Sequence, residues 1–249
     1  MSAQALDAGR GWQWIVGGFA LFRKSPFMWI ALTVVMVLIW MVSFLIPVLG
    51  PLLFNLLSPV LFAGLMLGCK ALERGEELEF AHLFAGFQNN ATALVTIGGV
   101  YLVGSIIILG AVWATAGGST LQTVMQKGPA DIQMVAGAIR SIALALLVGF
   151  ALYLPLLMLI WFAPILVVMN GMKPVEAMKL SLAACLTNWL AFLVYGAIFM
   201  VLWIVASIPL FLGLLVLLPV MFCSIYASYQ DIFAARRPEA PSGGNPFLR

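Results

Sequence analysis

Six long stretches of the 249-residue chain are almost entirely apolar. None of them contains an Asp, Glu, Lys or Arg in its central part. They run approximately over 28–48, 52–70, 92–116, 141–169, 189–209 and 211–233. Because about twenty apolar residues of helix cross the roughly 30 Å hydrocarbon core of a bilayer, the pattern predicts six transmembrane helices.

The apolar stretches are predicted to be helices and not strands of a barrel. A membrane barrel strand alternates lipid-facing and lumen-facing residues, whereas "ALTVVMVLIWMVSFLIPVLG" (31–50) is apolar at nearly every position. The expected fold class is therefore an all-α integral membrane protein.

Three shorter segments precede the first, third and fifth spans, and each carries one apolar stripe at helical spacing. The stripes are Trp12, Ile15, Val16, Phe19 and Phe22; Phe80, Leu83, Phe84 and Phe87; and Val175, Met178, Leu182 and Cys185. Ser25, Asn90 and Asn188, residue types favoured as helix caps, follow the three segments. We expect three interfacial amphipathic helices lying at the level of the lipid headgroups.

These segments suggest an internal repeat within a single transmembrane domain, residues 1–235. Its units would be 9–75, 76–172 and 173–235, each an interfacial helix followed by a helical hairpin. Pro59, Pro164 and Pro219 lie in the second helix of each hairpin. The alternative is that unrelated hairpins simply look alike. The tail, 236–249, is rich in Pro, Gly and Ser and is predicted to be disordered in the cytoplasm.

Composition excludes a water-soluble fold. Charged residues make up 8% of the chain and the mean hydropathy is +1.12, whereas a soluble domain has about 25% charged residues. The first ten residues, "MSAQALDAGR", contain an Asp and precede an aromatic helix, so we expect no cleaved signal peptide.

The basic residues predict the topology. Ten of the twelve lie at the amino terminus, between spans two and three, between spans four and five, or in the tail; Lys127 and Arg140 are the other two. The positive-inside rule then places both termini in the cytoplasm and the loop between spans three and four outside. This distribution accounts for the net charge of +3 without nucleic acid as a partner.

Two groups of residues are candidates for binding. Arg23, Lys24, Lys173 and Lys179 flank the interfacial helices and are candidate contacts to anionic lipid headgroups, although membrane topology alone also explains them. Asn55 and Ser58 lie one turn apart beside Pro59, as in a polar cavity of a transporter; hydrogen bonds between packed helices are the alternative.

The chain offers little else for chemistry. His82 forms a Glu-x-x-His spacing with Glu79, but a di-metal site needs a second such motif and further carboxylates. The cysteines, Cys69, Cys185 and Cys223, are expected to be small buried apolar residues. "GLMLG" (64–68) is a small-xxx-small face for close helix packing, within the monomer or between protomers. We expect no catalytic, metal or cofactor site.

The block "GWQWIVGGFALFRKSPFMWI", with "HLFAGF" and "MNGMKPVEAMKLSLAACLTNW", resembles a family of proteobacterial multi-pass inner-membrane proteins. The family is broadly similar to YciC-type proteins and to the membrane domain attached to some glycerophosphodiester phosphodiesterases. The resemblance covers nearly the whole chain except the tail, and it implies the architecture and a bacterial inner-membrane location without catalytic residues.

The resulting hypothesis is a non-enzymatic inner-membrane protein that organises lipids or partner proteins in envelope homeostasis. Membrane lipids are the expected partners, with a membrane protein or a second copy of the chain as further candidates. The alternative hypothesis is a transporter of small solutes or lipids that uses a cavity near the proline-broken helices.

Overall fold

The structure, a computed structural model, describes residues 3–115 and 132–233, and all of its regular structure in these ranges is helical. The helices are α1 (Arg10–Phe22), α2 (Pro26–Ser43), α3 (Leu49–Glu73), α4 (Ala81–Gln88), α5 (Ala91–Thr115), α7 (Ile132–Trp161), α8 (Ala163–Asn170), α9 (Pro174–Thr187), α10 (Trp189–Ser207) and α11 (Leu214–Phe233). The predicted all-α class is confirmed. The predicted tail, 236–249, lies outside the described residues.

Six stretches are long and apolar enough to cross a membrane, as the sequence predicted. Five are the helices α2, α3, α5, α10 and α11, and the sixth runs through α7 and α8, from Val135 to Asn170. Their mean hydropathy lies between 1.4 and 2.5.

The helix ends differ from the predicted span ends where proline intervenes. α2 ends at Ser43 and not at 48, because Pro47 cannot donate to a helical ladder and disfavours helix in the residue before it. α10 ends at Ser207, two positions before Pro209, for the same reason. α7, in contrast, begins earlier than predicted, at Ile132 and not at 141. The backbone hydrogen bonds of an α-helix form within the helix, so the helix can extend beyond the apolar residues.

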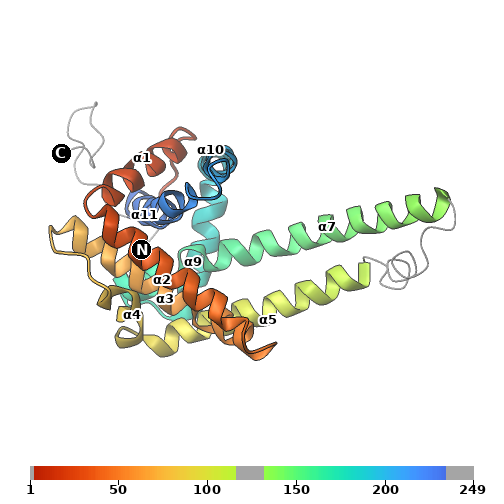
Figure 1. The fold of residues 1–249 in the computed structure, drawn as a ribbon, viewed down its shortest axis with the longest axis horizontal. Coiled ribbons are helices and arrows are strands. Elements are labelled where there is room, and N and C mark those ends of the chain that lie inside the picture. Colours follow the sequence, from red (N-terminus) through yellow and green to blue (C-terminus); the bar gives the residue numbers. More distant parts are fainter. Residues whose placement is uncertain (1–2, 116–131, 234–249) are drawn as a thin grey trace.

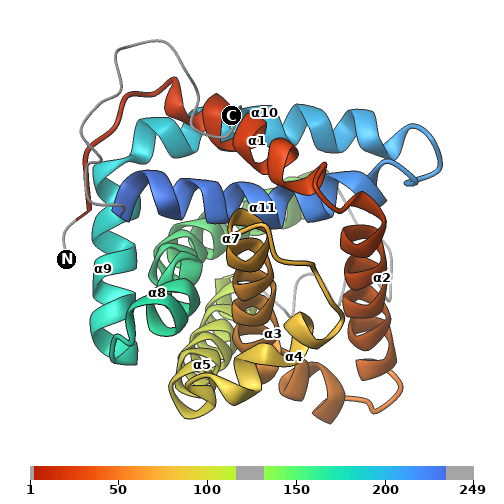
Figure 2. The ribbon, with the colours of Figure 1, turned by 90° about the vertical axis from the view of Figure 1, so that its left-hand side faces the viewer.

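The long helices form three antiparallel hairpins that leave a common body in different directions. Figure 1 shows the α5–α7 hairpin extending far from the body, and Figure 2 shows α10 and α11 side by side across the molecule while α2 runs roughly at right angles to them. A short helix precedes each hairpin: α1, α4 and α9. α4 packs against α3, α9 against α7 and α8, and α1 against α10 and α11.

The core of the body is formed mainly by the later parts of α3 and α11 and by α8, with further side chains from the short helices and the start of α2. In α3 and α11 the buried residues are concentrated from Pro59 and from Leu217 onward, and α8 is buried from Ala163 to Val167. Among its largest fully buried side chains are Trp14, Trp29, Phe162, Met66 and Tyr226. The first helices of the hairpins contribute far less, since α2, α5 and α10 expose most of their apolar side chains.

A serine from α9 bends the α7–α8 helix. The Ser181 hydroxyl donates to the Met158 carbonyl at 2.7 Å and accepts from the Phe162 amide at 2.9 Å. Those two backbone groups would pair with each other in an unbroken helix, so the hydroxyl is inserted into the ladder. Pro164 follows two residues after Phe162, in the first turn of α8, where proline is tolerated.

A glycine in α1 allows this helix to pack closely against α11. A Cβ atom added to Gly18 of α1 would lie 2.5 Å from the backbone nitrogen of Ser224 in α11. No side chain fits at that distance from a backbone atom, so glycine at 18 is what permits the close approach of the two helices.

We predict that Ser181→Ala destabilises the protein by about 1–3 kcal/mol, because it leaves the Phe162 amide and the Met158 carbonyl without a partner in a buried site. Thermal unfolding in detergent checks this. Ser141→Ala is the control, since Ser141 is partly exposed and its hydroxyl bonds only to Gly137 of its own helix. Equal melting temperatures for the two variants would contradict the assigned role.

Gly18→Ala is expected to lower stability by about 1–3 kcal/mol, because the methyl group forces α1 away from α11. Gly110→Ala, in α5, meets nothing within 4 Å and should be neutral or slightly stabilising through helix propensity. The measurement is again the melting temperature in detergent. If Gly18→Ala unfolds no earlier than Gly110→Ala, the close contact is not as described.

Candidate functional site

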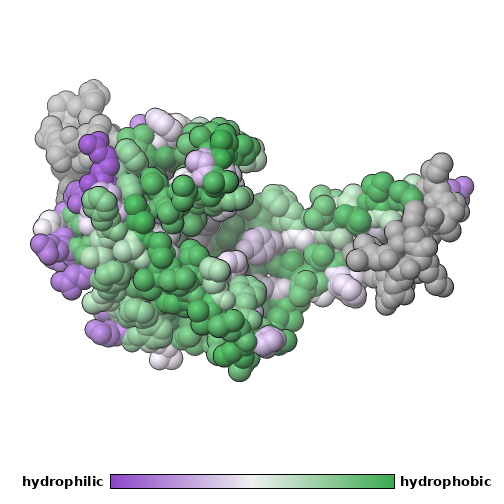
Figure 3. Space-filling view, viewed as in Figure 1, coloured by the Kyte–Doolittle hydropathy of each residue, from purple (hydrophilic) through white to green (hydrophobic). Residues whose placement is uncertain are grey.

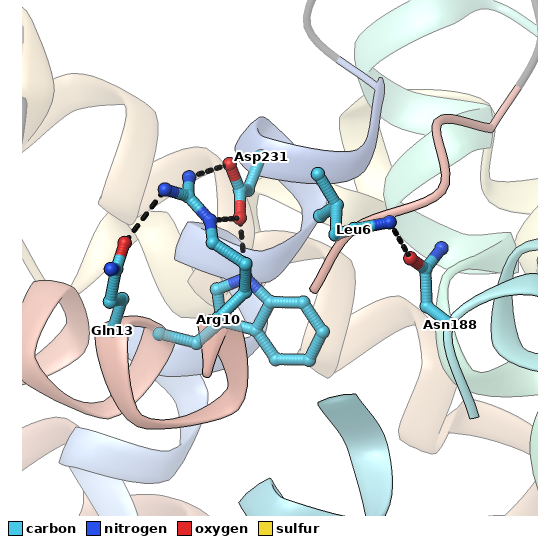
Figure 4. A network of polar contacts seen from close by, with 6 residues as sticks. Leu6, Arg10, Gln13, Asn188 and Asp231 are labelled. Atoms are coloured by element: carbon cyan, nitrogen blue, oxygen red, sulfur yellow. Dashed lines mark hydrogen bonds and ion pairs between the residues drawn. The ribbon is translucent and has the colours of Figure 1, made fainter. Parts of the chain in front are cut away.

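A polar cluster fixes the start of α1 to the end of α11 (Figure 4). The Arg10 guanidinium pairs with the Asp231 carboxylate, and the Trp14 indole N–H donates to Asp231 Oδ2 at 2.8 Å. Arg10 also donates to Gln13 Oε1 at 2.7 Å. The Asp231 carboxylate therefore has both a charged partner and a neutral donor, which is what a half-buried charge requires.

Asn188 holds the amino-terminal segment over the junction of α9 and α10 (Figure 4). Its Oδ1 accepts from the Leu6 amide at 2.8 Å, and its Nδ2 donates to the Gln4 carbonyl at 2.9 Å. Asn188 and Ser25 occupy helix N-cap positions as predicted, but neither side chain makes a capping bond. For Asn188 the reason is that its side-chain oxygen accepts a hydrogen bond from the Leu6 amide, 182 positions earlier in the chain.

A second polar cluster ties the ends of α3 and α8 to α11. The Tyr226 hydroxyl donates to Glu73 Oε2 at 2.6 Å, and the Tyr229 hydroxyl donates to Asn170 Oδ1 at 2.8 Å. Lys24, just before α2, donates to the Leu72 carbonyl at 2.9 Å. Figure 3 shows hydrophilic surface gathered on this side of the body, opposite the direction in which the α5–α7 hairpin extends.

The three short helices leave apolar side chains exposed on this polar side of the molecule. Each buries one face against the body: examples are Gly18, Leu83 and Ser181. The exposed large apolar side chains are Trp12 and Phe19 of α1, Phe80, Phe84 and Phe87 in or beside α4, and Val175 and Leu186 of α9. Five residues of the predicted stripes are instead buried: Ile15, Phe22, Leu83, Met178 and Cys185.

The four basic residues predicted to contact lipid headgroups are all exposed. Arg23 and Lys24 follow α1, and Lys173 and Lys179 lie at the start of α9 and within it. The structure does not gather them into one site, because the end of α1 that leads into α2 and helix α9 lie on opposite sides of the face in Figure 2. Within the described residues none of the four forms an ion pair.

Asn55 and Ser58 are satisfied within their own helix. Asn55 Nδ2 donates to the Pro51 carbonyl at 2.9 Å, and the Ser58 hydroxyl donates to the Asn55 carbonyl at 3.1 Å. That carbonyl is the one that Pro59 leaves without its helical donor. A cleft of about 180 Å³ lies nearby between α2, α3 and α11. Apart from Thr33, whose hydroxyl donates to the Trp29 carbonyl, its lining is apolar: Met36, Val37, Trp40, Phe54, Leu218 and Phe222.

The remaining candidates have local structural roles. His82 Nδ1 accepts from the Glu79 amide at 3.0 Å at the start of α4, and no group of three metal-ligating side chains occurs in the described part of the chain. The three cysteines are free and buried, as predicted. The small face of "GLMLG" packs within the monomer, since a Cβ at Gly64 would lie 2.4 Å from the His82 carbonyl oxygen of α4.

These features define a multi-pass helical membrane protein with a polar face at one end of the body. The chain is 30% identical over 257 residues to the probable inner membrane protein BTH_II0599 of Burkholderia thailandensis, an alignment that covers 95% of each protein. The chain belongs to the family of that probable inner membrane protein. No protein-family model matches the chain. No solved structure matches it either.

Cys185 lies on the buried face of α9, and its reactivity tests that burial. Desolvation raises the pKa of the Cys185 thiol to about 12, so the thiol stays neutral and unreactive at any pH well below that value. In a Cys69→Ala, Cys223→Ala background in detergent, we expect no maleimide labelling at pH 8.5. The same background with Cys185→Ala and Leu186→Cys is the control, because residue 186 is exposed. Equal labelling rates would contradict the burial of this helix face.

Proposed function

We propose that this protein is a non-enzymatic organiser of anionic lipids, with its short helices on the cytoplasmic face of the inner membrane. The observation that supports this most directly is that exposed apolar side chains of α1 and α9 lie beside exposed basic residues, which follow α1 and which begin and lie within α9. Large apolar side chains insert at the boundary between headgroups and acyl chains, while basic residues attract anionic headgroups by about 1 kcal/mol each.

The proposed orientation places both chain termini in the cytoplasm. It is supported by the distribution of basic residues, of which ten of twelve fall at the termini or between even- and odd-numbered spans. The polar clusters of Asp231 and Glu73 then lie at the cytoplasmic surface, where water is available to both carboxylates.

We further propose that the chain consists of three tandem units of a short helix and a hairpin. Each short helix packs against the second helix of the preceding hairpin: α4 against α3, α9 against α7 and α8, and α1 against α11. In this arrangement α1 closes a ring of three units. We also propose that the chain is related to YciC-type proteins and to the membrane domain attached to some glycerophosphodiester phosphodiesterases.

A membrane-protein partner or a second copy of the chain would dock beside the lipids under this proposal. The transport alternative has less support. The side chains of Asn55 and Ser58 donate to backbone carbonyls of their own helix, α3, and the neighbouring cleft is lined mostly by apolar side chains.

Neutralising the four basic residues tests the proposed function. The purified protein should enrich phosphatidylglycerol over phosphatidylethanolamine relative to the bulk membrane, measured by mass spectrometry of co-purified lipids. The quadruple variant Arg23→Gln, Lys24→Gln, Lys173→Gln, Lys179→Gln should lose that enrichment, by at least about fivefold if even one contact of 1 kcal/mol is lost.

The control is Lys127→Gln with Arg140→Gln, which removes the two basic residues that the orientation places outside. It should retain the enrichment of the unaltered protein. Unchanged enrichment in a folded quadruple variant, or no enrichment in the unaltered protein, would contradict the proposed function.

A further inference from the structure

The tips of two hairpins contain no polar side chains. Residues 44–54, "FLIPVLGPLLF", join α2 to α3, and residues 208–223, "IPLFLGLLVLLPVMFC", join α10 to α11 and continue into it. The corresponding segment between α5 and α7, "AGGSTLQTVMQKGPAD" (116–131), contains Ser, Thr, Gln, Lys and Asp. Turns in water are rich in Asn, Asp, Ser and Gly, so the first two tips have the composition of a buried segment.

These apolar tips are nevertheless exposed on the protein surface. Leu45 and Val48 of one tip are 78% and 76% exposed, and Ile208 and Leu210 of the other are 77% and 86% exposed. No described part of the protein covers them. A contiguous apolar patch of this kind requires an apolar environment of its own.

Most backbone amides of each tip donate to carbonyls within the tip or the adjoining helix end. Within residues 44–50 every amide except that of Val48 donates to a carbonyl of the same turn or the adjoining helix end, and within 208–215 every amide except that of Gly213 does so. The turns close through positive φ angles at non-glycine residues: Val48 (65°), Leu210 (50°) and Phe211 (63°). Internal pairing is the condition for placing backbone in hydrocarbon.

The first helix of each of these two hairpins, α2 and α10, is short. α2 has 18 residues and α10 has 19, which is about 27–29 Å of helix and just reaches across a core of roughly 30 Å when perpendicular to the membrane. α5 and α7 have 25 and 30 residues. Because the three hairpins leave the body in different directions (Figures 1 and 2), they cannot all be perpendicular to one bilayer, and a tilted short hairpin ends at a shallower depth.

We propose that α2–α3 and α10–α11 are re-entrant hairpins whose tips, residues 44–50 and 208–215, remain inside the bilayer against lipid acyl chains. The α5–α7 hairpin crosses the membrane and carries its polar tip to the far side. Four of the six apolar helices then enter and leave on the side of the short helices, so the protein displaces more lipid from that leaflet than from the other. This inference rests on the hairpin tips and does not depend on headgroup binding.

Single cysteines test the depth of each tip. In a Cys69→Ala, Cys185→Ala, Cys223→Ala background, Val48→Cys and Leu210→Cys are compared with Gln133→Cys at the exposed start of α7 and with Glu77→Cys in the exposed loop before α4. A membrane-impermeant maleimide is added to cells whose outer membrane is permeabilised, then to inside-out vesicles, and finally to protein denatured in SDS.

We expect Gln133→Cys to react in the cells, Glu77→Cys to react in the inside-out vesicles, and the two tip cysteines to react only after denaturation. A bimane label attached to Leu210→Cys in lipid nanodiscs should also be quenched by phospholipids brominated on their acyl chains. If Val48→Cys and Leu210→Cys react in cells as fast as Gln133→Cys, the hairpins cross the membrane and the proposal is wrong.

The experiments distinguish failure of the re-entrant hairpins from failure of the proposed lipid binding. Rapid labelling of the tips leaves the enrichment of phosphatidylglycerol unaffected, and loss of that enrichment leaves tip labelling unaffected. Labelling of Glu77→Cys in cells and not in inside-out vesicles would overturn the orientation on which the assignment of the far side depends.

Discussion

The structure depends on one constraint: backbone amides and carbonyls in hydrocarbon must find their partners within the protein, because no water is available. This requirement selects helices for the apolar stretches. It also explains the places where the helices are interrupted. Ser181 supplies a hydroxyl to both backbone groups at the α7–α8 bend, and Ser58 donates to the carbonyl that Pro59 frees in α3. Both of these breaks in a helical ladder are repaired by a nearby hydroxyl.

The same constraint applies to the charged side chains, which must lie near water or be hydrogen-bonded. The carboxylates of Asp231 and Glu73 lie at the end of the body where hydrophilic surface gathers, and each has at least two donors. These contacts join α11 to α1 and α3, while Tyr229 joins it to α8. α11 is thus the element to which the rest of the body is attached, which explains why it is the most buried of the six apolar helices.

The sequence predicted the helical class and the number of apolar helices, because length and hydropathy alone determine them. It placed the end of α2 too late, since the residues before Pro47 are as apolar as those in the helix. It also assigned Ile15 and Phe22 of α1 to the lipid, whereas both are buried in the body. Lipid and protein interior are equally apolar, so a hydrophobic stripe does not reveal which of the two it contacts.

The four basic residues remain a predicted lipid-contact site, to which the structure adds their exposure and their arrangement. Arg23, Lys24, Lys173 and Lys179 are exposed, as expected for headgroup contacts, but pattern alone did not show that they lie apart on the same face. The cluster of Arg10, Trp14 and Asp231 was missed entirely. Its members are separated by up to 221 positions, and no local spacing signals a contact at that distance along the chain.

Hydrogen exchange in lipid nanodiscs, followed by mass spectrometry, tests most directly whether internal pairing in a water-free environment governs this fold. The account predicts strong protection of the amides in 44–50 and 208–215, although both segments are turns on the protein surface, and rapid exchange in the exposed loop around Glu77. Exchange of the two turns as fast as that loop would show that water reaches them and would contradict the account.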